Sequence, residues 1–305
     1  MHAEHVFLFM RHDFRISRNL RAQWYFDHLN KEIEWSPETA VEGNEDLEIV
    51  GVVPSTSSSG LNSPRPEQQT TGSSSSAQTY KVTTDTVVTF LSRRYRLVFI
   101  LDLSPSLAVV DSGCDEVLFG KVVQALERCL IGLTAPMIIP GSNGRQHRPM
   151  IYVTVIAHTP FFSAHAPQVL VQGSLVTARN VGSLIASVRR KLVSFENCVA
   201  GTAAVALEQL QILKIYAESM VGRLFEDVEA LPQEGDLVKT AMVTPDRSFV
   251  NMLRSGILAM QLLPENTSAS LVIITDGVTG VPEASLLNTV LVQLRNWTLA
   301  CSFIK

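Results

Sequence analysis

The sequence has few cysteines, no excess of positive charge and no long apolar run, and each shortage excludes a class of protein. Its four cysteines lack the paired spacing of a zinc site or a disulfide framework, so we expect reduced thiols. The 25 Lys and Arg are outnumbered by 29 Asp and Glu, and the net charge of −4 leaves no basic field to attract nucleic acid. No apolar run approaches the roughly 20 residues that a membrane-spanning helix needs. The first ten residues also lack the features of a secretion signal, so we expect a cytoplasmic protein without direct membrane insertion.

Composition divides the chain into three parts. Hydrophobic residues make up 46% of the sequence and charged residues 18%, which is typical of a protein with a large buried core. Residues 1–53 predict a strand, an amphipathic helix and a second strand that pack on the main domain. Residues 54–79 are rich in Ser, Thr, Gln and Pro, so we expect a disordered linker. Residues 80–305 predict the main domain, with a helical insertion at about 178–240 and a truncated carboxyl end.

The main domain is predicted to be an α/β fold around two central strands. The runs VFILDL (98–103) and LVIITD (271–276) are almost wholly apolar and carry a carboxylate at their ends, as expected of neighbouring strands covered on both faces. Residues 86–92 are expected to pair with the first run as a hairpin. The alternation of strands and helices predicts a Rossmann-like, mostly parallel sheet with flanking helices. Further strands are expected at 150–157, 168–176 and 299–304, and helices at 115–133, 248–263 and 284–296.

Oxygen-bearing side chains lie where these strands end. They are Asp102, Ser104 and Ser106 after the first run, Thr244 before a helix, and Asp276 at the end of the second run. Because loops after parallel strands converge at one edge of the sheet, we expect these five residues, the predicted metal set, to lie together. Carboxylates and hydroxyls are hard ligands that suit Mg²⁺ or Mn²⁺. An ion held by so few charges could take a carboxylate from a partner.

The same residues also have purely structural interpretations, and these stay open. Either of the two serines could cap a turn, and Thr244 followed by Pro245 is a good start for a helix. Asp276 followed by Gly277 is a common turn after a strand. His158 and His165 flank another loop and are expected to be solvated or locally hydrogen bonded.

The predicted metal set resembles the metal-ion-dependent adhesion site of von Willebrand factor A domains. The matching motifs are D-x-S-x-S after the first central strand, a Thr before a helix, and a strand-end TDG. The resemblance implies a von Willebrand factor A-type fold that holds Mg²⁺. The sequence departs from the pattern at Pro105, where the family often has Gly, and at Met242–Val243, where no Gly precedes the Thr. The first two motifs are also unusually far apart, which implies a large helical insertion between them.

Longer segments resemble the amino-terminal region of the seizure threshold two family of scaffold proteins. They include VFLFMRHDFRISRN, VFILDLSPS, YVTVIAHT, QVLVQGSL, AMVTPDRSFVNMLRSGILAMQLLP and VIITDGVTGVP. QVLVQGSL and GILAMQLLP carry no obvious chemistry, so they point to this family beyond the fold. The resemblance implies a non-enzymatic subunit of the KICSTOR complex, with the other KICSTOR subunits and the GATOR1 complex as partners. It also implies a place at the lysosomal surface, reached through partners, with the peroxisome as a second location. There the complex would repress target-of-rapamycin complex 1 (TORC1) signalling on amino-acid or glucose starvation.

Two other functions compete with this interpretation. A haloacid-dehalogenase-like phosphatase also has an Asp after a buried strand, but it needs a second Asp two positions later as general acid, and Ser104 stands there. A metal-dependent adhesion-type domain outside this pathway would share the fold, and a secretion signal or disulfides would favour it. The sequence contains no GxSxG, GxxxxGK[ST] or HExxH motif, so we expect no catalytic activity.

Overall fold

The chain folds into two compact units in the computed structural model. The first comprises residues 1–95, 135–150 and 265–268, and the second comprises residues 96–134, 151–264 and 269–305. The structure describes residues 1–10, 18–36, 47–55, 77–103, 110–111, 116–159, 167–224, 245–262, 267–275, 284–296 and 300–304. The linker predicted at 54–79 falls outside these residues apart from its two ends, so its disorder stays a prediction, as do the three domain boundaries.

The first unit is built on a three-stranded sheet in the order β3-β1-β5. In β1 alternate side chains such as Val6, Leu8 and Met10 are buried, which is the period of a strand with one face on a core. β3 pairs with β1 in antiparallel fashion and β5 pairs with it in parallel. The elements of this unit include β1 (Ala3–Met10), α1 (Arg18–His28), β2 (Glu32–Trp35), β3 (Leu47–Pro54), β4 (Gln78–Lys81) and β5 (Val87–Leu91).

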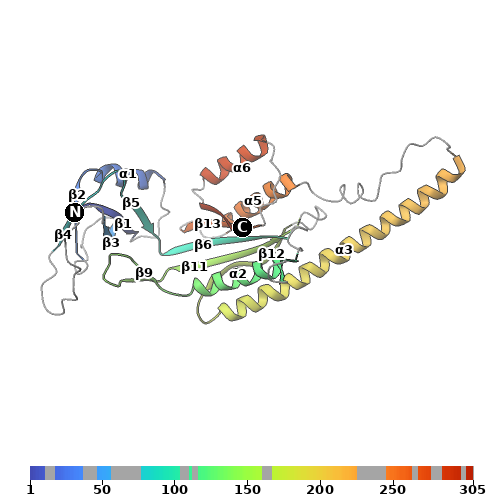
Figure 1. Cartoon of the computed structure of the whole chain (residues 1–305), viewed down its shortest axis with the longest axis horizontal. Coiled ribbons are helices and arrows are strands. Elements are labelled where there is room, and N and C mark those ends of the chain that lie inside the picture. Colours follow the sequence, from blue (N-terminus) through green and yellow to red (C-terminus); the bar gives the residue numbers. More distant parts are fainter. Residues whose placement is uncertain are drawn as a thin grey trace. The chain divides into compact units, whose positions relative to one another are not determined.

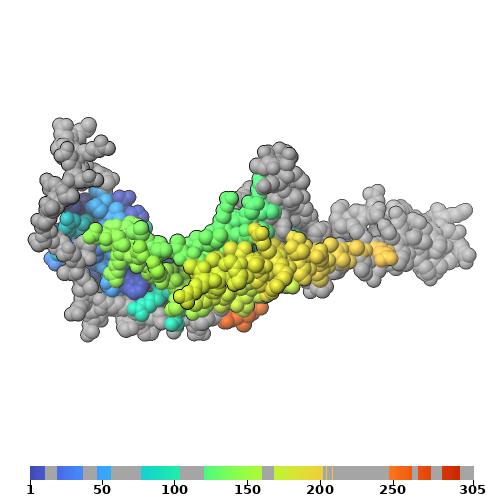
Figure 2. Space-filling model, turned by 90° about the horizontal axis from the view of Figure 1, so that it is seen from below, coloured from blue at the N-terminus to red at the C-terminus, as the bar shows by residue number. Residues whose placement is uncertain are grey.

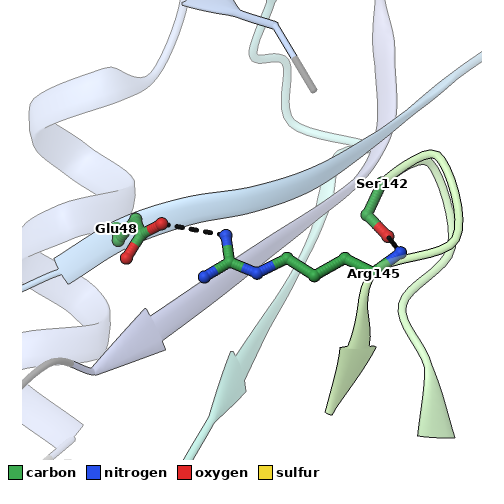
Figure 3. A network of polar contacts seen from close by, with 3 residues as sticks. All are labelled: Glu48, Ser142 and Arg145. Carbon is green, nitrogen blue, oxygen red and sulfur yellow. Dashed lines mark hydrogen bonds and ion pairs between the residues drawn. The ribbon is translucent and has the colours of Figure 1, made fainter. Parts of the chain in front are cut away.

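A short hairpin from the middle of the chain also belongs to the first unit. It consists of β9 (Met137–Ile138) and β10 (Gln146–His147). Arg145 donates a hydrogen bond of 2.9 Å to the Glu48 carboxylate of β3, and its backbone N–H donates to the Ser142 hydroxyl (Figure 3). Gly141 has a φ of 70°, and a Cβ there would lie 2.1 Å from the Val52 carbonyl oxygen. Only glycine therefore allows this close approach of two backbones.

The second unit is built on a five-stranded sheet in the order β12-β11-β6-β13-β14 (Figure 1). β13 and β14 are parallel, whereas the edge strand β12 is antiparallel to β11. The residue directly after β6 and the last residue of β11 are joined by a 2.7 Å hydrogen bond from the Leu103 N–H to the His158 carbonyl, so these two strands run in the same direction. The strands are β6 (Arg94–Asp102), β11 (Met150–His158), β12 (Pro167–Val176), β13 (Ser268–Ile274) and β14 (Ala300–Ile304).

The prediction that the two carboxylate-bearing runs form neighbouring strands is confirmed, because β6 and β13 lie side by side. The predicted hairpin between 86–92 and β6 is wrong. β5 pairs instead with β1, in the three-stranded sheet of the first unit. The physical reason is visible at Ser92–Arg93: a two-residue hairpin turn favours Gly, Asn or Asp at positive φ, and neither residue is of that kind.

Helices cover both faces of the five-stranded sheet. α5 and α6 lie on one side, and α2 and α3 lie on the other (Figure 1). An ion pair between Arg189 and Glu127 joins α3 to α2, and Figure 2 shows α3, in yellow, along this face. The helices are α2 (Leu118–Gly132), α3 (Val181–Leu224), α5 (Pro245–Gln261) and α6 (Ala284–Asn296). No helix in the described part of the chain is long and apolar enough to cross a membrane.

The main core lies between the sheet and the pair α5–α6. It takes alternate residues from three strands, such as Ile100 of β6, Ile156 of β11 and Ile273 of β13. Gly256 lets α5 approach the sheet, because a Cβ there would lie 2.5 Å from a methyl carbon of Leu271. The structure is therefore a mixed α/β fold with parallel strand pairs and flanking helices, as the alternation of elements predicts.

Candidate functional site

Polar side chains replace apolar ones at the carboxyl ends of three neighbouring strands. Core residues that face α5 and α6 lie at alternate positions of β6 and β13 and at Ile156 of β11. The next position on each strand is polar: Asp102 on β6, His158 on β11 and Thr275 directly after β13. Ser248, in the first turn of α5, lies close to this row. We call Asp102, His158, Ser248 and Thr275 the strand-end cluster.

Asp102 is the acidic member of the cluster and is only 4% exposed. Its Oδ2 accepts a 2.8 Å hydrogen bond from the Thr275 hydroxyl, which is itself buried. Taking a carboxylate out of water is costly unless donors surround it, so this bond stabilises the charge. It also joins the carboxyl ends of β6 and β13, and these two strands therefore run in the same direction.

His158 is the most deeply buried member, at 1% exposed. Its Nδ1 lies 3.5 Å from the Ser248 hydroxyl oxygen, a long contact. Its Nε2 is also buried and has no hydrogen-bond partner among the described residues. Burial lowers the pKa of this histidine to about 4, because it penalises the charged imidazolium, and the ring is therefore neutral at pH 7. Of the two expectations for this residue, solvated or locally hydrogen bonded, the first is wrong, because His158 is buried and contacts Ser248; His165 lies outside the described residues.

The cluster contains the residue types of a Ser-His-Asp triad, but the contacts differ from those of a triad. In a catalytic triad the Asp orients the His Nδ1 and the Ser faces Nε2. Here Ser248 faces Nδ1, and the Asp102 Oδ2 accepts from Thr275. The contacts of Ser248, His158 and Asp102 are therefore not those of a catalytic triad.

Of the predicted metal set, only Asp102 lies among the described residues, and Ser104, Ser106, Thr244 and Asp276 lie outside them. The elements next to these four nevertheless approach one another. Asp102 bonds to the residue that precedes Asp276. α5 begins at Pro245, directly after Thr244, and its first turn reaches His158. Whether the five residues meet around one ion stays a prediction. No three His, Cys, Asp or Glu side chains group together in the described part of the chain.

The sequence analysis missed Ser248 and Thr275 and did not predict the burial of His158. A signal was available on β6 and β13, because Asp102 and Thr275 each extend an alternating row of apolar residues. That pattern shows which side of the strand a residue occupies. It does not show which helix covers that side, so the proximity of Ser248 required the structure.

No protein-family model matches the chain. Among solved structures, it aligns with a mutant of the PilB minor pilin from Streptococcus sanguinis at a TM-score of 0.31 and 11% sequence identity. The alignment covers 81% of this chain, which spans 47% of the length of that chain. Similarity at this level supports no conclusion about fold or function.

Proposed function

We propose that the chain is a non-enzymatic, protein-binding scaffold with a von Willebrand factor A-type domain. The observation that carries this proposal is the hydrogen bond between Thr275 and Asp102. Asp102 is the first residue of the D-x-S-x-S motif, and Thr275 is the first residue of the TDG motif. The bond supports the proposal because it joins two motifs that are far apart in the sequence at the carboxyl edge of one sheet.

A divalent cation at this edge would give the domain a means of binding partners. The predicted metal set would supply carboxylate and hydroxyl oxygens, which suit Mg²⁺. Asp102 fits this role because it is an anionic side chain at the end of a central strand, where ligands of open α/β sheets bind. When bound, the ion would present an open position to an acidic side chain of a partner.

We place the partners in the nutrient-signalling pathway that the sequence resemblance implies. The chain would belong to the seizure threshold two family and act within the KICSTOR complex, recruiting GATOR1 to the lysosomal surface and repressing TORC1 on starvation. The support is the resemblance of segments without catalytic or metal-binding chemistry, such as QVLVQGSL, which forms most of β12. The peroxisome is the second location.

A pull-down tests both parts of the proposal. Tagged protein is recovered from cells with and without a chelator, as the wild type, as Asp102→Asn and as the control Asp85→Asn. The control removes the same charge from an exposed turn. We expect KICSTOR and GATOR1 subunits with the wild type and the control, and a loss with Asp102→Asn that matches the loss caused by chelation.

The outcomes distinguish a metal-dependent partner contact from the scaffold role as such. Undiminished recovery with Asp102→Asn and with chelator would discard the metal contact and leave the scaffold standing. A wild-type protein that recovers none of these subunits would contradict the pathway. Chelator-sensitive recovery of a protein outside both complexes would instead favour an adhesion-type domain that works elsewhere.

A further inference from the structure

The Nε2 atom of His158 is a buried polar atom without a hydrogen-bond partner among the described residues. Buried polar side-chain atoms are nearly always hydrogen bonded, because leaving one without a partner destabilises the folded state. His158 is 1% exposed, and its Nε2 has no protein partner in the part of the chain that the structure describes. A ligand that accepts a nitrogen lone pair would satisfy this atom.

His158 and Asp102 are neighbours at the end of the sheet. The hydrogen bond from the Leu103 N–H to the His158 carbonyl sets the register of the two parallel strands. In this register Asp102 lies beside His158, and both side chains are on the face covered by α5. Adjacent strands are separated by about 4.8 Å, so one ion could reach both side chains.

The other ring nitrogen is arranged as in a metal-binding histidine. Such a histidine usually donates its second ring N–H to a nearby oxygen, which holds the ring in the required tautomer. The His158 Nδ1 lies next to the Ser248 hydroxyl, whose oxygen can accept a hydrogen bond from the ring N–H. The ring can then present the lone pair of Nε2.

We propose that His158 is a metal ligand together with Asp102, and that the site takes a borderline-soft divalent ion such as Zn²⁺ or Co²⁺ in preference to Mg²⁺. The inference rests on the metal site of the proposed function and changes its chemistry. Imidazole nitrogen suits Zn²⁺ and related transition metals, whereas Mg²⁺ prefers an all-oxygen set. Ser248 acts as a positioning residue that fixes the tautomer of the ring.

The test is metal binding by the purified, chelator-stripped chain. Co²⁺ is titrated and followed by its visible absorption and by calorimetry, and Mg²⁺ is titrated in parallel. The variants are His158→Gln, Asp102→Asn and the control His147→Gln. His147 is a buried histidine of the first unit whose Nε2 already contacts the Ser92 carbonyl, so its loss removes no proposed ligand.

We expect one Co²⁺ per wild-type chain, bound at least about tenfold more weakly by His158→Gln and Asp102→Asn and equally well by His147→Gln. Nitrogen NMR of the wild type with Zn²⁺ gives a readout that a structural histidine would not move. One imidazole resonance should shift strongly, and the shift should disappear in Asp102→Asn. The NMR experiment also decides the matter if His158→Gln does not fold.

Three results would overturn the inference. Co²⁺ binding by His158→Gln as tight as in the wild type would remove His158 from the ligand set. Mg²⁺ binding that depends on Asp102 but not on His158 would indicate an all-oxygen site, so that the proposed function stands and this inference fails. No histidine shift at saturating Zn²⁺ would have the same meaning for His158.

Discussion

The bond between Thr275 and Asp102 should be a measurable source of stability for the second unit. The substitution Thr275→Val keeps the shape of the side chain and removes only the hydroxyl that donates to the carboxylate. Both residues are almost fully buried, at 6% and 4% exposed, so water cannot readily replace the lost donor. Thr289→Val is the matched control, because the Thr289 hydroxyl donates to a backbone carbonyl on the exposed surface of α6.

The expected loss follows from the charge and the burial of the pair. A hydrogen bond to a charged group contributes about 1.5–3 kcal/mol, so we expect Thr275→Val to lower the free energy of unfolding by about 2 kcal/mol. In a unit of this size the loss corresponds to about 4–8 °C in melting temperature. The control should change the free energy by less than about 0.5 kcal/mol, as is usual for surface substitutions.

Circular dichroism at a helical wavelength is a suitable assay, because α2, α3, α5 and α6 all belong to the second unit. Thermal melting of the two variants and of Asp102→Asn combined with Thr275→Val would show whether the two residues are coupled. A melting temperature of Thr275→Val within about 1 °C of the wild type, at most half the shift of a 1 kcal/mol loss, would refute the argument. It would mean that the carboxylate does not depend on this hydroxyl.

Three further predictions concern residues away from the site. Arg96→Met should lower the melting temperature of the second unit, since the buried guanidinium donates a 2.6 Å hydrogen bond to the Met260 carbonyl. We expect the free energy of unfolding to fall by about 2 kcal/mol in the same melts, and an unchanged melting temperature would contradict this prediction. Burial lowers the pKa of His147, outweighing a hydrogen bond to the Ser92 carbonyl. The unfolded chain therefore binds the proton first, and the stability of the first unit should fall as the pH drops below about 6.5; urea titrations followed by tryptophan fluorescence should show a flatter profile for His147→Gln. Gly141→Ala should destabilise this unit by about 2 kcal/mol or more, and Gly144→Ala, which has a positive φ but no close neighbour, by about 1 kcal/mol; equal effects in the same titrations would argue against the backbone contact.

Much of the main sheet could be predicted because its signals are local. Residues 98–101 and 271–274 are apolar without interruption, which identifies strands covered on both faces. The helix expected at 248–263 is present, but α5 begins earlier, at Pro245, since proline suits the first turn of a helix. Asp102 could be placed at a strand end for the same reason, because it directly follows an apolar run.

The pairing of strands and the burial of the site were decided by the tertiary structure. Sequence spacing shows that β5 is a strand, but its partner β1 lies about 80 residues earlier, and nothing local to β5 specifies that choice. β12 shows the same limit, because its apolar pattern is compatible with either direction and only its register against β11 makes it antiparallel. The burial of His158 depends on α5, which is distant in sequence and brings Ser248 to the ring. The spacing of apolar residues thus determined which segments are strands and helices and which side of each is buried. Which other segment packs against that side was decided only by contacts between distant parts of the chain. The reason is that the free energy of packing depends on both of the surfaces that meet.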